Sequence, residues 1–216
     1  MIAFHGDPKI KAFYLNRIRQ HCLADELVKG QYWKNGRGCG IGCTIHSGSH
    51  VAYETDLGIP QILARLEDVT FERLENGEAM LWPERFLATI PVGADLSLVW
   101  PRYAVWMLGD TTHGVLRHAK TERMRLGIRG VLDLYQEWVD LGMKPDAKRF
   151  SAAYDAYAAY ATADACRAWW LASAAKLLEL LGHAPVVSEA KPSEAGAMLA
   201  GKVDVYLGGK PKGDEA

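Results

Sequence analysis

The chain has 216 residues, a formal net charge of -1 at pH 7 and 49% hydrophobic residues, which suits one domain, or one domain with an appendage. The balanced charge removes a global electrostatic case for binding nucleic acid or an anionic membrane. Residues 1–20 lack the continuous apolar segment of a signal peptide, and no run of about 18 apolar residues could span a bilayer. We therefore expect a cytoplasmic protein, with four reduced cysteines and with neither a membrane nor a nucleic acid as its partner.

Helical periodicity with recognisable boundaries runs through the first two thirds of the chain. Asp7-Pro8 is typical of a helix start and Gly30 of a helix end, while Asn76-Gly77 predicts the end of another helix. Pro101 lies inside an apolar segment and predicts a kink or a division into two pieces. We expect helices over about residues 8–29, 60–75, 82–90, 95–110 and 121–141.

A long alanine-rich segment over about residues 146–182 predicts the longest helix, a thin spine with high helix propensity. Its aromatic side chains also favour a protein partner or a second copy of the chain binding along residues 150–172. These aromatic residues are Tyr154, Tyr157, Tyr160, Trp169 and Trp170.

After Gly182 the composition changes, and two short strands are expected, over Pro185–Val187 and Lys202–Leu207, before a flexible tail. The predicted fold is mainly α: an irregular multi-helix single domain with one long alanine-rich helix and strands few or absent. The predicted domain covers residues 1–182 and includes a Gly/Cys/His loop over 35–60, and residues 183–216 form a C-terminal appendage.

The stretch Asn35–Pro60 concentrates the residues that could carry chemistry. Cys39, Cys43, His46 and His50 follow one another at spacings of four, three and four residues, and Glu54 follows four residues later. On a continuous helix they would form a row roughly 16 Å long, too long for one tetrahedral ion. The interleaved glycines make a regular helix unfavourable, so a folded loop would be needed to bring the four side chains together.

Three interpretations of this loop remain open. Thiolates and imidazoles are zinc ligands, so Cys39, Cys43, His46 and His50 could hold a metal ion, although the spacing matches no usual zinc knuckle. Alternatively, Cys43 or Cys39 could be a nucleophile with His46 or His50 as its base. Glu54 or Asp56 could then orient the imidazole. In the third interpretation the glycines, cysteines and histidines serve packing. No cofactor is expected, although zinc or another transition metal is possible at this loop.

Two other groups of charged residues are less informative. Basic residues between Arg117 and Arg129 are interpreted as a solvated helix face, because no aromatic residues accompany them. Glu67, Asp68 and Glu72 resemble a carboxylate cluster, but the Glu-x-x-His motif of di-iron bundles is absent.

Over about residues 20–182 the chain resembles a family of uncharacterised bacterial and prophage-encoded proteins. That family is marked by a GC-x-x-GCT core, a nearby histidine, a YE-x-x-LGIP step, an LARLED helix and a late alanine/aromatic-rich helix. The matching residues here are Trp33, Asn35-Gly36, Gly38-Cys39, Gly42–Thr44, His50, Tyr53-Glu54, Leu57–Pro60, Leu63–Asp68 and Ser151–Ala175. The resemblance implies a phage or mobile-element context, in which small helical proteins often bind host components.

The leading functional hypothesis is therefore a phage- or mobile-element-associated helical protein that acts by binding a host or phage partner. One alternative is a cysteine–histidine hydrolase or transferase centred on the Gly38–Glu54 loop. Another is a zinc-stabilised helical module. Whether the protein is an enzyme is left open by the sequence.

Overall fold

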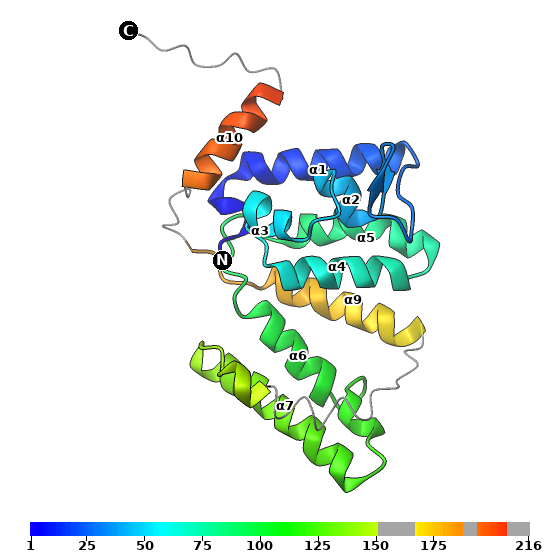
Figure 1. Cartoon of the computed structure of the whole chain (residues 1–216), viewed down its shortest axis with the longest axis vertical. Coiled ribbons are helices and arrows are strands. Elements are labelled where there is room, and N and C mark those ends of the chain that lie inside the picture. Colours follow the sequence, from blue (N-terminus) through cyan, green and yellow to red (C-terminus); the bar gives the residue numbers. More distant parts are fainter. Residues whose placement is uncertain (151–166, 188–193, 207–216) are drawn as a thin grey trace. The chain divides into compact units, whose positions relative to one another are not determined.

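The computed structural model describes residues 1–150, 167–187 and 194–206, and helices dominate them (Figure 1). This confirms the predicted mainly α fold, since the one sheet among the described residues is an antiparallel pair of two-residue strands. The elements in chain order are η1 (Ala3–Gly6), α1 (Pro8–Leu23), β1 (Trp33–Lys34), β2 (Arg37–Gly38), α2 (Gly40–Ile45), α3 (Val51–Leu57), α4 (Gln61–Arg73), α5 (Asn76–Thr89), α6 (Val99–Gly109), η2 (Val115–His118), α7 (Glu122–Leu141), α9 (Arg167–Gly182) and α10 (Glu194–Tyr206).

The chain divides into two compact units. The first unit combines Met1–Ser97 with Leu181–Ala216, and the second covers Leu98–Leu180. The predicted boundary between residues 182 and 183 stays a prediction. Among the described residues, no helix combines the length and the apolar character that a bilayer crossing requires.

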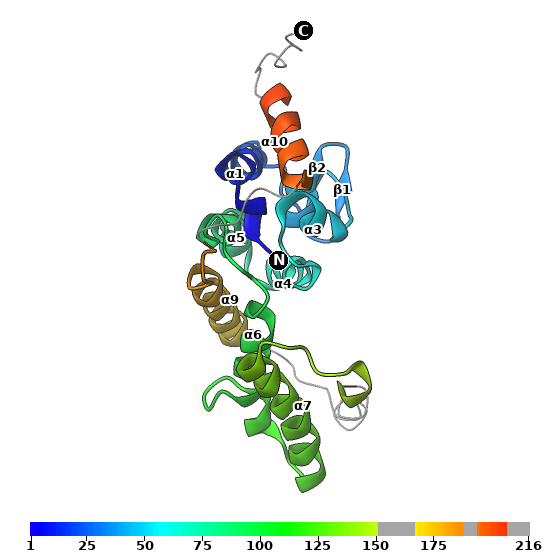
Figure 2. The ribbon, with the colours of Figure 1, turned by 90° about the vertical axis from the view of Figure 1, so that its left-hand side faces the viewer.

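The first unit is built around α1, α2, α4 and α5, which pack against one another. Figure 2 shows α5 next to α1 and α4. Its interior consists of large apolar side chains without solvent exposure, including Ile10, Ile18, Phe71 and Phe86. Such burial contributes about 1.5–3 kcal/mol for each large side chain. The Gly/Cys/His loop is anchored on this core, because α2 packs against α1, α4 and α5.

Two helix boundaries in this unit differ from the prediction. Helix α1 ends at Leu23, six residues before the predicted end, and Asp25 then adopts a left-handed conformation with φ of 54°. Leu27 beyond it pairs with Gly38 in an isolated β-bridge, so tertiary pairing overrides the helical pattern there. Asn76-Gly77 begins α5 instead of ending α4, because the extended residues Leu74 and Glu75 already separate the two helices.

The second unit packs α6 against α7 and η2. Leu108, Ala119, Ile128 and Val131 form its buried cluster. Pro101 lies in the first turn of α6, where a missing backbone N–H costs little, so the predicted kink does not occur. Of the predicted helix over about 146–182, residues 147–150 and Arg167–Gly182 are helical, and residues 151–166 lie outside the described residues.

The segment after Gly182 contains one bridge and one helix. Val186 pairs with Ala94 in an antiparallel bridge, which agrees in part with the strand predicted over Pro185–Val187. The strand predicted from Lys202 is wrong as far as Tyr206, where α10 is formed instead. Valines at alternate positions near the end of this segment are typical of a strand. Alanine, however, is the best helix former, and Val203 is buried as a residue of the helix.

Asp7 caps α1 as predicted, because its Oδ1 accepts a hydrogen bond from the Lys9 N–H at 2.8 Å. We expect Asp7→Ala to lower the free energy of unfolding by about 1 kcal/mol, since an N–H of the first turn loses its acceptor. Urea denaturation followed by circular dichroism measures this. Asp7→Asn keeps an acceptor and is the matched control; an equal loss in both variants would contradict the cap.

Candidate functional site

The Gly/Cys/His loop begins with a tight hairpin. Strands β1 and β2 pair Lys34 with Arg37, and the two residues between them, Asn35 and Gly36, have φ of 53° and 81°. Two consecutive positive φ angles define the hairpin turn for which Asn-Gly is the preferred sequence. The hairpin returns the chain to Gly38, directly before α2.

The segment just before the hairpin lies closely against α2. The Cys39 N–H donates to the Gln31 carbonyl at 2.7 Å. A Cβ atom at Gly38 or at Gly42 would overlap the Tyr32 carbonyl oxygen, so the backbone can approach only because both positions lack a side chain. Successive side chains of an extended chain point to opposite sides, so Tyr32 and Trp33 leave this contact in different directions.

Both cysteines of the loop are buried behind this contact. The exposed fractions are 1% for Cys39 and 0% for Cys43. Burial raises the pKa of the Cys43 thiol to about 12, and burial together with the nearby Asp68 carboxylate raises the pKa of Cys39. The Cys43 thiol donates to the Gly38 carbonyl, with Sγ 3.4 Å from the oxygen. Both sulfurs therefore stay protonated near neutral pH, which is unfavourable for a nucleophile or a metal ligand.

His46 lies at the end of α2 and contacts residues that the sequence patterns did not associate with it. Its imidazole stacks on the Trp33 indole, with ring centroids 4.4 Å apart. Its Nε2 is 2.8 Å from the Nε2 of His21, on α1. The other ring nitrogen of His21, Nδ1, is 2.6 Å from an oxygen of Glu26.

His50 lies beside a different group. Its Nε2 is 3.2 Å from Oδ2 of Asp68, on α4, and its ring meets the Tyr32 ring edge-on with centroids 5.5 Å apart.

Glu54 has a structural partner: its Oε1 accepts a hydrogen bond from the Gln61 N–H at 2.9 Å, at the start of α4. Glu54 therefore stabilises a helix end instead of orienting a catalytic imidazole.

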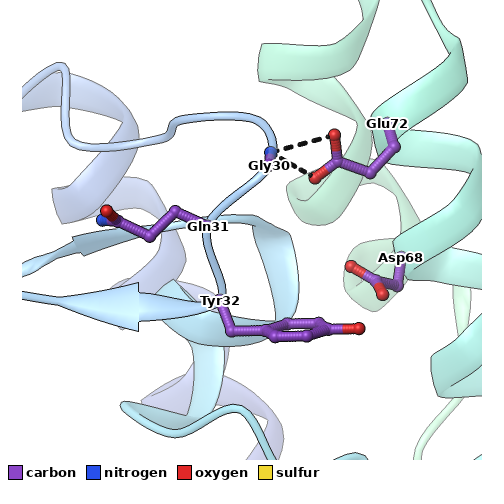
Figure 3. A pocket seen from close by; sticks show the side chains of 5 residues that line it. All are labelled: Gly30, Gln31, Tyr32, Asp68 and Glu72. Atoms are coloured by element: carbon purple, nitrogen blue, oxygen red, sulfur yellow. Dashed lines mark hydrogen bonds between the residues drawn. The ribbon is translucent and has the colours of Figure 1, made fainter.

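A pocket of about 220 Å³ opens beside Asp68 (Figure 3). Tyr32, Asp68 and Glu72 line it together with Gly30 and Gln31. Figure 3 shows the Tyr32 ring on one side and the two carboxylates of α4 on the other. The Gly30 N–H donates to both oxygens of Glu72, at 2.9 and 3.1 Å, so this carboxylate fixes the loop as well as lining the pocket.

One residue before Asp68, Glu67 is buried without any exposure. Neither of its side-chain oxygens, nor the Tyr53 hydroxyl, is hydrogen-bonded by any of the described residues. Burial, with the nearby Asp68 carboxylate, raises the pKa of Glu67 well above its usual value, so the carboxyl is uncharged at neutral pH. A Cβ at Gly40 would overlap Glu67, which explains a third glycine of the loop.

The four predicted ligands therefore do not share one site. His46 pairs with His21, His50 pairs with Asp68, and the two thiols are buried. Within the described residues, no group of three or more His, Cys, Asp or Glu side chains is placed to hold a metal ion. The composition of the loop identified it in the sequence, but its partners His21, Tyr32 and Asp68 all lie outside it. Of these, only Asp68 had a sequence signal, as part of the carboxylate cluster with Glu67 and Glu72.

Comparison of the chain with protein-family models, with curated proteins and with solved structures gave no match. Any functional conclusion thus depends on the geometry of these residues.

The contact between the Tyr32 carbonyl and α2 predicts a large effect of adding one methyl group. Gly42→Ala should lower the free energy of unfolding by at least about 3 kcal/mol, because the oxygen in the way belongs to the backbone. Gly77→Ala in α5 is the matched control, since no atom lies within 4 Å of its added Cβ. That variant should be stabilised by about 0.4–1 kcal/mol. Equal stabilities of the two variants would contradict the contact.

The uncharged Glu67 predicts how stability changes with pH. Above the unfolded-state pKa of 4.5 the unfolded chain releases a proton that the folded chain keeps, so stability falls as pH rises toward the raised pKa. Glu67→Gln removes this loss. The free energy of unfolding of Glu67→Gln, relative to that of the unchanged protein, should increase by up to about 1.4 kcal/mol for each pH unit above pH 5. Urea unfolding at several pH values measures it, with Glu78→Gln on the surface of α5 as control. A pH-independent difference would contradict the uncharged state.

The buried thiols predict slow alkylation. Under native conditions iodoacetamide should label the half-buried Cys22 at least about tenfold faster than Cys39 or Cys43, as peptide mass spectrometry can resolve. If either loop cysteine instead reacted faster near neutral pH than an ordinary free thiol, the cysteine–histidine enzyme hypothesis would gain support.

Proposed function

We propose that the protein is a phage- or mobile-element-associated protein that acts by binding a host or phage protein, and that the pocket of Tyr32, Asp68 and Glu72 receives a basic side chain of this partner. The mobile-element context comes from the sequence resemblance. The binding role is supported by the pocket, and above all by the state of Asp68.

Asp68 is the observation that carries the proposal. Only 9% of the residue is exposed, and its Oδ1 accepts no hydrogen bond from any of the described residues. A nearly buried carboxylate oxygen without a donor is costly, and a charged donor offsets that cost best. His50 contacts the other oxygen, Oδ2, whereas Oδ1 is buried and has no donor among the described residues.

The rest of the pocket favours a cation as that ligand. Tyr32 is 49% exposed and offers an aromatic ring, which attracts ammonium and guanidinium groups. Glu72 adds a second carboxylate on the same helix. The volume of about 220 Å³ is below the roughly 300–1,000 Å³ of pockets for drug-sized ligands. A single lysine or arginine side chain suits this size better than a cofactor does.

The aromatic face predicted along residues 150–172 stays a second prediction for the same function. Residues 151–166 lie outside the described residues, including Tyr154, Tyr157 and Tyr160. Trp169 is described, and its Nε1–H donates to the His113 carbonyl at 3.0 Å within the second unit. This indole therefore has an internal role, so the pocket of the first unit is the better-supported contact.

The geometry favours binding over the cysteine–histidine enzyme. Neither loop cysteine has an imidazole as hydrogen-bond partner among the described residues, and burial raises both thiol pKa values. The predicted zinc ligands are likewise divided between separate pairs. We therefore do not propose catalysis by Cys43 or a site that combines Cys39 and Cys43 with His46 and His50.

The pocket can be tested before its partner is known, using small probes. Titration of labelled protein with N-acetyl-arginine amide should shift the amide NMR signals of Gly30, Tyr32 and Asp68, whereas N-acetyl-norleucine amide, which has no charge, should not. Asp68→Asn should weaken binding roughly 10–100-fold, as expected for loss of a charged hydrogen bond. Glu78→Gln is the control. Binding of the uncharged probe, or unchanged binding to Asp68→Asn, would contradict the proposal.

A photo-crosslinking amino acid in place of Tyr32 then tests for the protein partner in host cells. The same group in place of Leu23, an exposed residue outside the pocket, is the control. A protein crosslinked at position 32, absent at position 23 and displaced by N-acetyl-arginine amide, would support the proposal. Capture that the probe does not displace would argue against the pocket as the contact.

A further inference from the structure

The pair of His21 and His46 lies outside the pocket and has no part in the proposed binding of a basic side chain. The two imidazoles come from α1 and from the end of α2, and their Nε2 atoms face each other at 2.8 Å. Their rings are nearly perpendicular, with an interplanar angle of 84° and centroids 5.0 Å apart. Two ring nitrogens on separate helices thus converge on one point.

Glu26 decides which nitrogen of His21 carries the proton. Its carboxylate is 2.6 Å from His21 Nδ1, and a carboxylate at that distance accepts a hydrogen bond, so the proton is on Nδ1. The Nε2 of His21 then has a free lone pair directed at His46. A carboxylate that holds an imidazole in this tautomer is the arrangement found behind metal-binding histidines.

His46 is held so that it can present a lone pair to the same point. Its backbone is left-handed, with φ of 54°, and its ring is fixed by stacking on Trp33 at 4.4 Å. Burial and the Arg17 guanidinium lower the pKa of His46 to about 4, so the ring is neutral at physiological pH. Without a ligand the Nε2–H of His46 donates to His21. Moving that proton to Nδ1 leaves two lone pairs facing each other.

The distance between the two nitrogens is close to what a metal ion requires. Bonds of about 2.0–2.1 Å at a tetrahedral angle place two nitrogen ligands about 3.3 Å apart. The observed 2.8 Å would have to widen by about half an ångström, with a tilt of the two rings, to admit an ion. His46 is exposed, so an ion can reach the pair and water can occupy its other positions.

We propose that His21 and His46 form a binding site for a divalent transition-metal ion that prefers imidazole, namely Cu²⁺, Ni²⁺ or Zn²⁺, with Glu26 orienting His21. The site differs from the one the sequence suggested, because it uses His21 in place of both cysteines and His50. It leaves at least two coordination positions for water or for a ligand from another molecule.

Isothermal titration of the untagged full-length protein with Ni²⁺ and Zn²⁺ tests the site. One equivalent should bind. Glu26→Gln should weaken the affinity roughly 10–100-fold, as loss of an orienting carboxylate does elsewhere. His21→Gln and His46→Asn should weaken it further; asparagine is chosen because it tolerates the left-handed backbone. His118→Ala, at an exposed histidine of the second unit, and His50→Ala, at the pocket, should bind as the unchanged protein does.

Equal metal affinity in the unchanged protein and in folded His46→Asn would overturn the proposal. A loss of affinity in His50→Ala as large as that in His46→Asn would also overturn it. If a variant fails to fold, electron paramagnetic resonance of one equivalent of Cu²⁺ in the unchanged protein decides. Coupling to two imidazole nitrogens is expected, and coupling to one or none would overturn the site. The proposal for the pocket is independent, since its probes contact Asp68 and not His46.

Discussion

The close approach of the Tyr32 carbonyl to α2 is the constraint on which the rest of the first unit depends. It is possible only because Gly38 and Gly42 have no side chains, and the hydrogen bond from the Cys39 N–H to Gln31 holds it. From this point Tyr32 reaches the wall of the pocket beside Asp68, while Trp33 reaches His46. One backbone contact thus positions two chemically different groups of residues. The glycines of the loop serve this approach instead of making the loop flexible.

The chemistry of the loop depends on which residues the contact between Tyr32 and α2 shields from water. The two cysteines and Glu67 lie on its buried side, where the loss of hydration favours their uncharged forms. The imidazoles and Asp68 lie at the margin, where charged or lone-pair groups can meet a ligand. The residue types that first suggested a thiol site therefore separate into an inert interior and a polar margin. Function is more readily assigned to the margin.

Local signals predicted much of this fold. The Asp7 cap, the start of α7 near Thr121 and the helix after Pro60 each depend on residues within one turn, and the structure confirms them. Local sequence patterns were misleading where distant contacts compete with them. Gly30 has the positive φ that is typical of a residue after a helix, yet α1 ends earlier, at Leu23, because Leu27 pairs with Gly38. The pairs of His46 with His21 and of His50 with Asp68 join residues 25 and 18 positions apart. No periodicity encodes such pairs, so the loop could be located from the sequence but its partners could not.

Native-state hydrogen exchange at the Cys39 amide tests the central contact most directly. This N–H donates to the Gln31 carbonyl where the loop meets α2, so its exchange reports whether the two separate without global unfolding. We expect it to exchange with the same free energy of opening as core amides of α4, such as that of Leu63. Exchange as fast as that of the exposed hairpin residue Lys34 would show that the loop opens locally, and would contradict the claim that this contact positions both groups of residues.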